Sequence, residues 1–130
     1  MKYLVDTDWI IDALANIPDA ITALRLFARD GIAVSIVSYA ELFDGAYGSQ
    51  HPQAEIARIQ QFLASYPVIN LSEAIGDRFG QTRSRLRSRG MLIPDLDLLI
   101  GVTAVVHNLT IMTRNVRHFG RIPGLVMYMP

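Results

Sequence analysis

The sequence predicts a three-layer α/β/α sandwich around a mostly parallel sheet of four or five strands. Short apolar segments rich in β-branched residues alternate with longer segments of helical periodicity. Strands without a polar face are typical of parallel sheets that helices cover on both sides. At 130 residues the chain is close to the commonest domain size, so we expect residues 1–130 to form one domain.

Five segments are predicted to be strands. Residues 2–6 and 32–37 ("IAVSIV") are short, β-branched and nearly all apolar. Residues 67–71 ("PVINL") and 109–113 ("LTIMT") are similar, and residues 125–129 ("LVMYM") form the fifth candidate. Ligands of such sheets gather beyond the carboxyl ends of the strands, so that edge is where we look for function.

Helical segments lie between these strands. Pro18 and Pro52 suit first helical turns, and Gly31 and Gly90 suit helix ends. The expected helices are residues 18–30, a helix capped by Ser38, residues 52–65, residues 72–89 with Ser72 at the start, and residues 95–107 capped by Asp95.

The composition excludes several classes of protein. Without cysteine, the chain has no disulfide, no thiolate nucleophile and no sulfur-ligated zinc site. No apolar run approaches the roughly 18 to 20 residues of a membrane span, and the acids Asp6, Asp8 and Asp12 rule out the apolar core of a secretory signal. We therefore expect a cytoplasmic protein without a membrane segment.

The net charge is zero, but the charges are unevenly distributed. Residues 1–77 hold ten acids and four bases, and residues 78–130 hold two acids and eight bases, giving −6 and +6. The segment "RFGQTRSRLRSRG" carries five arginines: Arg78, Arg83, Arg85, Arg87 and Arg89. A solvated helix face and a patch that meets phosphates or a protein partner both explain it.

Carboxylates follow the predicted strands or begin helices. Asp6 ends the first strand, Glu41 stands three residues after Ser38 in a capping-box arrangement, and Asp95 and Asp97 lie in a first helical turn. Capping and the helix dipole explain each acid taken singly. Together, Asp6, Glu41 and Asp97 would converge on one edge of the sheet.

Converging carboxylates repel one another unless a cation binds or their pKa values rise. An all-oxygen site of this kind suits the hard cations Mg²⁺ and Mn²⁺. The histidines His51, His107 and His118 are scattered, so no pair has the spacing of a zinc site. The sequence therefore predicts a magnesium or manganese site.

Four motifs in order, "LVDTD", "SYAEL", "IPDLDLLIGVTA" and "TRNVRHFGRIPGL", resemble those of the PIN-domain ribonucleases, specifically the VapC-type toxins of toxin–antitoxin pairs. The resemblance covers essentially the whole chain. It implies that Asp6, Glu41 and Asp97 are catalytic metal ligands and that Asn115 is the fourth catalytic position.

The resemblance also assigns supporting residues. Thr7 and Thr113 match hydroxyls that orient the acids, while Asp8 and Asp95 are expected to support the site or cap helices. Many relatives have another acid where this chain has His118, which we expect to be a loop residue rather than a ligand.

The implied activity is hydrolysis of RNA phosphodiester bonds with Mg²⁺ or Mn²⁺, leaving 5′-phosphate and 3′-hydroxyl ends. Arg114, Arg117 and Arg121 would attract the RNA backbone, and Arg83 and Arg87 would meet RNA or an antitoxin. The resemblance implies a VapB-type antitoxin that crosses the active-site groove. It also implies a homodimer, with which the mean hydropathy of +0.26 is compatible.

Two other functions fit parts of the sequence. "LVDTD" also resembles the first motif of haloacid-dehalogenase-type phosphatases, which need a lysine, and the only lysine here is Lys2. A PIN fold that acts only as a binding module is the second alternative, against which the intact Asp6, Glu41 and Asp97 argue. Cleavage of RNA that depends on Asp6 distinguishes the nuclease from both.

Overall fold

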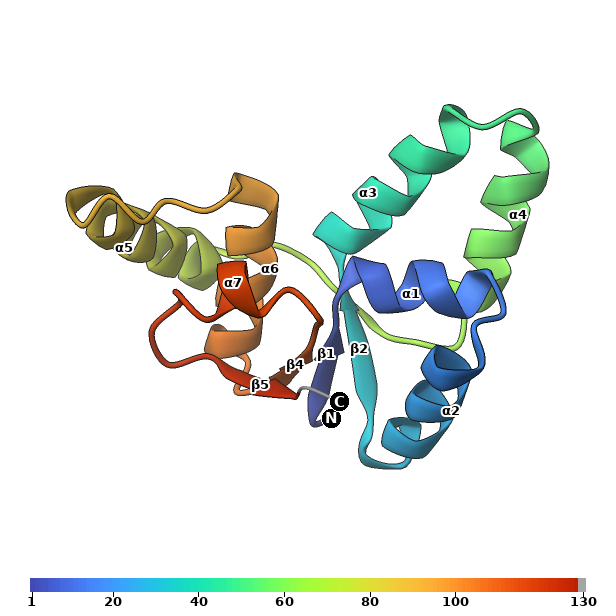
Figure 1. Cartoon of the computed structure of the whole chain (residues 1–130), viewed down its shortest axis with the longest axis horizontal. Helices are drawn as coiled ribbons and strands as arrows, with labels where there is room; N and C mark the ends of the chain where they lie inside the picture. The colour runs from blue at the N-terminus through green and yellow to red at the C-terminus, as the bar shows by residue number, and fades with distance from the viewer. Residues whose placement is uncertain (129–130) are drawn as a thin grey trace.

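The computed structural model describes residues 1–128 and contains a five-stranded parallel sheet (Figure 1). Its strands are β1 (Tyr3–Val5), β2 (Ile32–Ser35), β3 (Val68–Ile69), β4 (Thr110–Met112) and β5 (Val126–Tyr128). Their order in the sheet is β3-β2-β1-β4-β5, and every neighbouring pair is parallel. Val5 pairs with Val34 and with Met112, so the segments that follow β1, β2 and β4 begin at one edge.

Helices cover both faces of the sheet, as predicted. They are α1 (Thr7–Leu14), α2 (Pro18–Phe27), a 3₁₀ turn η1 (Ala28–Asp30), α3 (Ile36–Tyr47), α4 (Pro52–Leu63), α5 (Glu73–Ser88), α6 (Asp95–Val106) and α7 (Val116–Phe119). In Figure 1, α1 to α4 lie on one side of the sheet and α5, α6 and α7 on the other. No helix within residues 1–128 is long and apolar enough to cross a membrane.

The pleat of β1 divides the core into two halves. Successive side chains of a strand point to opposite faces, so Tyr3 and Val5 pack with α1, α2 and α4 while Leu4 packs with α5 and α6. All three side chains are buried. The apolar composition of the predicted strands follows from this two-sided burial, and the three-layer sandwich is confirmed.

The predicted boundary between the second strand and its helix was wrong. β2 ends at Ser35, whose hydroxyl accepts a hydrogen bond from the Val37 N–H (3.0 Å) and caps α3. Ser38, the predicted cap, is instead buried inside α3. The apolar pair Ile36 and Val37 belongs to the first helical turn, where Val37 and its neighbours face the core.

Two other predicted caps also differ. Pro94 occupies the N-cap position of α6, so Asp95 is the first helical residue, and its carboxylate pairs with Arg83 (2.8 Å). Asp6 caps α1, and Asp8 lies in the first turn. The helices predicted at residues 18–30, 52–65, 72–89 and 95–107 are present, with η1 forming the last turn of the first. The fifth predicted strand includes residue 129, which lies outside the described residues.

Candidate functional site at the carboxyl edge of the sheet

The predicted convergence of acids occurs. An open pocket of about 240 Å³ lies at the carboxyl edge of the sheet and is lined by Asp6, Thr7, Asp8, Ile11, Glu41, Asp97 and Asn115. Four carboxylates therefore share one pocket: Asp6 directly after β1, Asp8 on α1, Glu41 on α3 and Asp97 on α6. Asp95 and Thr113 do not line it, although Thr113 holds one of the acids from behind.

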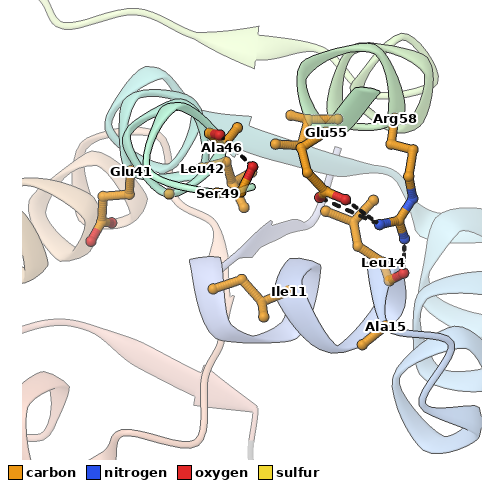
Figure 2. Close-up of a pocket in the computed structure, with 11 residues that line it drawn as sticks. Ile11, Leu14, Ala15, Glu41, Leu42, Ala46, Ser49, Glu55 and Arg58 are labelled. Carbon is orange, nitrogen blue, oxygen red and sulfur yellow. Dashed lines mark hydrogen bonds and ion pairs between the residues drawn. The ribbon is translucent and has the colours of Figure 1, made fainter. Parts of the chain in front are cut away.

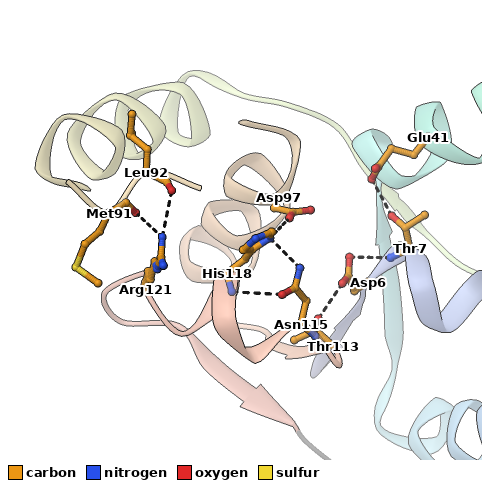
Figure 3. Close-up of polar contacts among 10 residues, drawn as sticks. All are labelled: Asp6, Thr7, Glu41, Met91, Leu92, Asp97, Thr113, Asn115, His118 and Arg121. Atoms are coloured by element: carbon orange, nitrogen blue, oxygen red, sulfur yellow. Dashed lines mark hydrogen bonds and ion pairs between the residues drawn. The ribbon is translucent and has the colours of Figure 1, made fainter. Parts of the chain in front are cut away.

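Asp6 is the most deeply placed of these acids. Its backbone N–H donates to the Met112 carbonyl (2.9 Å), which fixes it at the end of β1. Its Oδ1 accepts from the Thr7 N–H and its Oδ2 from the Thr113 hydroxyl, both at 2.8 Å (Figure 3). Burial, followed by the charge of Asp8, raises the pKa of Asp6 to about 7 despite these two hydrogen bonds.

Glu41 reaches the pocket from the second turn of α3. Its Oε1 accepts from the Thr7 hydroxyl at 2.9 Å, and the Ser38 hydroxyl lies 2.8 Å from that of Thr7. Thr7 has one hydroxyl proton, so it donates to Glu41 and can accept from Ser38. Burial is the main cause that raises the pKa of Glu41, and the charge of Asp97 adds to it. The hydroxyl role predicted for Thr7 corresponds to this contact.

Asp97 contacts His118, whose place in the fold was predicted incorrectly. His118 lies in α7 rather than in a loop, and its Nδ1 is 2.7 Å from Asp97 Oδ2. Asn115 Nδ2 lies 2.8 Å from the same Nδ1, and Asn115 Oδ1 accepts from the His118 N–H at 3.3 Å. The side-chain carbonyl of Asn115, the fourth catalytic position that the resemblance implies, thus caps α7. A four-residue helix is too short to show periodicity, so no sequence pattern predicted the contacts of His118 with Asp97 and Asn115.

Asp8 contributes an unsatisfied oxygen to the pocket region. Its Oδ1 is buried and has no hydrogen-bond partner within residues 1–128. Burial is the main cause that raises the pKa of Asp8, while the charge of Arg114 acts in the opposite direction. A buried acceptor without a donor costs free energy, so this oxygen favours a site that receives a cation or a water molecule.

The predicted basic residues differ in whether other residues of the chain already bind their guanidinium groups. Arg114 pairs with Asp12, and its guanidinium carbon lies 4.4 Å from the centre of the Trp9 ring. Arg83 is held by Asp95. Arg121 donates to the carbonyls of the loop before α6, Met91 (3.4 Å) and Leu92 (3.2 Å) (Figure 3). Within residues 1–128, Arg87 and Arg117 form no ion pair.

The oxygen atoms of the pocket suit a hard divalent cation, although the acidic side chains form hydrogen bonds with other residues of the chain. Within residues 1–128, no three Asp, Glu or His side chains are close enough to hold an ion as they stand. The acids are instead held by Thr7, Thr113 and His118. Each carboxylate oxygen can accept more than one contact. Four carboxylates line the pocket, and one of their residues, Asp8, has a buried oxygen without a partner within residues 1–128. Oxygen donors of this kind suit Mg²⁺ or Mn²⁺.

The phosphatase alternative does not fit this site. Lys2 precedes β1 and so lies at the amino edge of the sheet, opposite the carboxylates, with its Nζ 5.4 Å from the centre of the Tyr3 ring. It has no route to a phosphate bound beside Asp6.

Comparison with known proteins agrees with this arrangement. The family model of the PIN domain matches residues 3–125, so the chain belongs to the PIN-domain family. Ribonuclease VapC2 of Rickettsia felis is 32% identical over 98% of this chain and 96% of its own length. A tRNA(fMet)-specific endonuclease VapC of Shigella flexneri is 30% identical over 96% of this chain and 95% of its own. Within the PIN-domain family, the chain groups with these VapC proteins.

Solved structures show the same fold. VapBC2 of Rickettsia felis, bound to a DNA fragment from its promoter, matches with a TM-score of 0.92 and 29% identity over 98% of both chains. VapBC-1 of nontypeable Haemophilus influenzae matches with a TM-score of 0.88 and 33% identity over 98% of this chain and 97% of the other. The α/β arrangement around the carboxylates is therefore that of VapC chains.

Proposed function

We propose that residues 1–130 form one nuclease domain, a metal-dependent endoribonuclease toxin that acts in the cytoplasm and is neutralised by a VapB-type antitoxin. The observation that carries the proposal is the pocket in which Asp6, Glu41 and Asp97 meet. The relatives support it, because they are named as ribonucleases and cover nearly the whole chain.

Asp6, Asp97 and Glu41 would hold Mg²⁺ or Mn²⁺, which when bound activates water and offsets the charge of the phosphate. The chain's own residues prepare the acids for this role. Thr113 fixes the rotation of the Asp6 carboxylate, and Thr7 does the same for Glu41. Loss of the proton that burial favours on Asp6 would accompany binding. Asn115 lines the same pocket and completes the proposed catalytic set.

Hydrolysis would release a 5′-phosphate and a 3′-hydroxyl. The acidic pocket repels phosphate, so attraction for RNA must come from basic residues around it. We assign this role first to Arg87 and Arg117, which form no ion pair within residues 1–128. Arg83 and Arg114 would contact RNA or antitoxin only by sharing or leaving Asp95 and Asp12.

The test is cleavage of RNA by the folded, antitoxin-free chain with Mg²⁺ and with Mn²⁺. We expect the wild type to cut and Asp6→Ala to lose at least about a hundredfold in rate, as removal of a group central to charge stabilisation does. Asp19→Ala is the matched control, because Asp19 is exposed on α2, beyond the far end of α1 from the pocket. Equal cleavage by wild type and Asp6→Ala would exclude this mechanism, and no cleavage with either metal would favour the binding module.

An apolar groove beside the site is our candidate for antitoxin binding. It has a volume of about 350 Å³ and lies between α1, α3 and α4 (Figure 2). Ile11, which is 53% exposed, and Leu42 line it. Glu41 lines both the groove and the acidic pocket, so a peptide seated in the groove would end at the active site.

A glycine in the groove and an exposed threonine outside it allow a matched test. A Cβ at Gly45, which lines the groove, would meet nothing within 4 Å, and Thr22 is exposed on α2, outside the groove. Gly45→Gln should therefore fold normally, fill the groove and weaken antitoxin binding about tenfold or more, whereas Thr22→Gln should not. The measurement is calorimetric titration with the antitoxin encoded beside the toxin; equal affinities would place the antitoxin elsewhere.

We also propose that the chain forms a homodimer. Light scattering on the purified 14.5 kDa chain tests this directly, since a dimer has twice that mass. A monomer at micromolar concentration would exclude a stable dimer.

A further inference from the structure

One side chain outside the pocket holds Asp97. His118 Nδ1 lies 2.7 Å from Asp97 Oδ2, and Figure 3 shows the imidazole facing the carboxylate from the side of α7. An ionised carboxylate only accepts hydrogen bonds, so Nδ1 must carry a proton and donate it. The histidine contacts Oδ2 and not Oδ1. The contact therefore occupies one oxygen and leaves the other available.

Packing between α6 and α7 produces this contact. Gly101 lies one turn after Asp97 on the same face of α6. A Cβ at Gly101 would lie 2.2 Å from Ile122 Cδ1 and 3.3 Å from Phe119 Cδ1. The missing side chain thus lets Phe119, which is fully buried, lie directly on α6. The residue before it, His118, is thereby fixed beside Asp97.

Asn115 competes for the same imidazole nitrogen. Its Nδ2 lies 2.8 Å from His118 Nδ1, but one nitrogen cannot donate to Asp97 and accept from Asn115 at the same time. A hydrogen bond to a charged acceptor is roughly twice as strong as a neutral one, so the bond to Asp97 prevails. Asn115 contributes instead by capping α7 through Oδ1.

We propose that His118 is a positioning residue: its Nδ1–H fixes the carboxylate of Asp97 so that Oδ1 is presented to a divalent cation in the pocket. This inference rests on the proposed function, because it assigns a role within the same site. Outer hydrogen bonds that orient a metal-binding carboxylate are worth about 10- to 100-fold in affinity or activity.

Replacing His118 with Asn or Gln tests which of the two imidazole nitrogens is needed. In His118→Asn the side-chain nitrogen stands where Nδ1 does, whereas in His118→Gln it reaches toward the place of Nε2. Mn²⁺ affinity is measured by calorimetry on the antitoxin-free chain, and the unfolding midpoint is recorded for each variant. We expect His118→Asn to bind within about threefold of the wild type, and His118→Gln and His118→Ala to bind about tenfold more weakly or worse.

Gly101→Ala tests the packing step separately. The added Cβ should displace α7 and weaken Mn²⁺ binding although His118 is still present. Replacing His118 with Ala as well should then lower the Mn²⁺ affinity little further. If that variant fails to fold, the His118 series still decides.

Three results would overturn the inference while the nuclease stands. His118→Asn could bind Mn²⁺ as weakly as His118→Ala does, or the wild type and the three His118 variants could bind Mn²⁺ equally well. The third is that His118→Ala binds Mn²⁺ more tightly than the wild type. A wild type that cuts no RNA and binds no Mn²⁺ would instead remove the proposed function as well. If all three His118 variants lost Mn²⁺ affinity and also had a lowered unfolding midpoint, the role of His118 would be purely structural. That result would also contradict the inference.

Discussion

At the scale of single residues, Asp6 should make the metal-free protein sensitive to pH. Its folded pKa of about 7 lies above the ordinary value of 3.8, because of burial first and the charge of Asp8 second. The folded state then binds more protons than the unfolded state between these values, so stability falls as pH rises. The part contributed by Asp6 is fully present below about pH 4 and is lost as the pH passes 7.

The check is the free energy of unfolding by urea between pH 4.5 and 7.5 in EDTA. We expect a decline on the order of a few kcal/mol, since one pKa unit corresponds to about 1.4 kcal/mol. Asp6→Asn cannot titrate and should give a flatter curve, and added Mn²⁺ should oppose the decline in the wild type. Parallel curves for wild type and Asp6→Asn would contradict the raised pKa.

At the scale of elements, the start of α3 links helix stability to the site. Ser35 caps α3, which carries Glu41, and Ser72 caps α5 through the Ile75 N–H (3.3 Å) without contact to the pocket. Ser35→Ala and Ser72→Ala should each lower stability by about 1 kcal/mol. Only Ser35→Ala should also reduce RNA cleavage, because fraying at the start of α3 moves Glu41 away from Thr7.

Urea denaturation and cleavage rates on the same samples measure both effects. Cleavage by Ser35→Ala as fast as by the wild type would mean that the position of Glu41 does not depend on the cap. A loss of cleavage in Ser72→Ala as large as in Ser35→Ala would point to general destabilisation instead.

The five strands and the long helices were predictable from sequence, whereas the start of α3 and the contact of His118 were not. The helix at residues 52–65 has a full apolar stripe, and Ile56, Ile59 and Leu63 are indeed buried. Ile36 and Val37 were assigned to a strand because β-branched residues favour strands, whereas the cap at Ser35 and core packing make them helical. The contact of His118 depends on the close approach of Phe119 at Gly101, which no local pattern contains.

At the scale of the whole molecule, topology explains why the candidate site was predictable. Strands that alternate with helices form a parallel sheet, and their carboxyl ends meet at one edge whatever the loop details. Asp6, Glu41, Asp97 and Asn115 therefore shared a pocket as expected. The partners of each acid were less predictable, since a hydrogen bond depends on side-chain rotation that only the packed structure fixes.

The two charge halves of the sequence occupy different sides of the sheet. The acidic half, residues 1–77, includes α1 to α4, and the basic half, residues 78–130, includes most of α5 with α6 and α7 (Figure 1). The acidic pocket lies where these halves meet. An RNA strand should therefore approach from the side of α5 and α7, because positive charge there can oppose the repulsion of the carboxylates.

This geometry predicts the salt dependence of RNA binding. In an Asp6→Ala background, which should not cut, the logarithm of affinity for a single-stranded RNA should fall with the logarithm of salt concentration. Each phosphate contact contributes a slope of about 0.7, so Arg87→Ala and Arg117→Ala should each reduce the slope by about that amount. Arg29→Ala is the control, because Arg29 precedes β2 at the amino edge of the sheet. Unchanged slopes for Arg87→Ala and Arg117→Ala, measured by fluorescence anisotropy, would mean that RNA does not approach over α5 and α7.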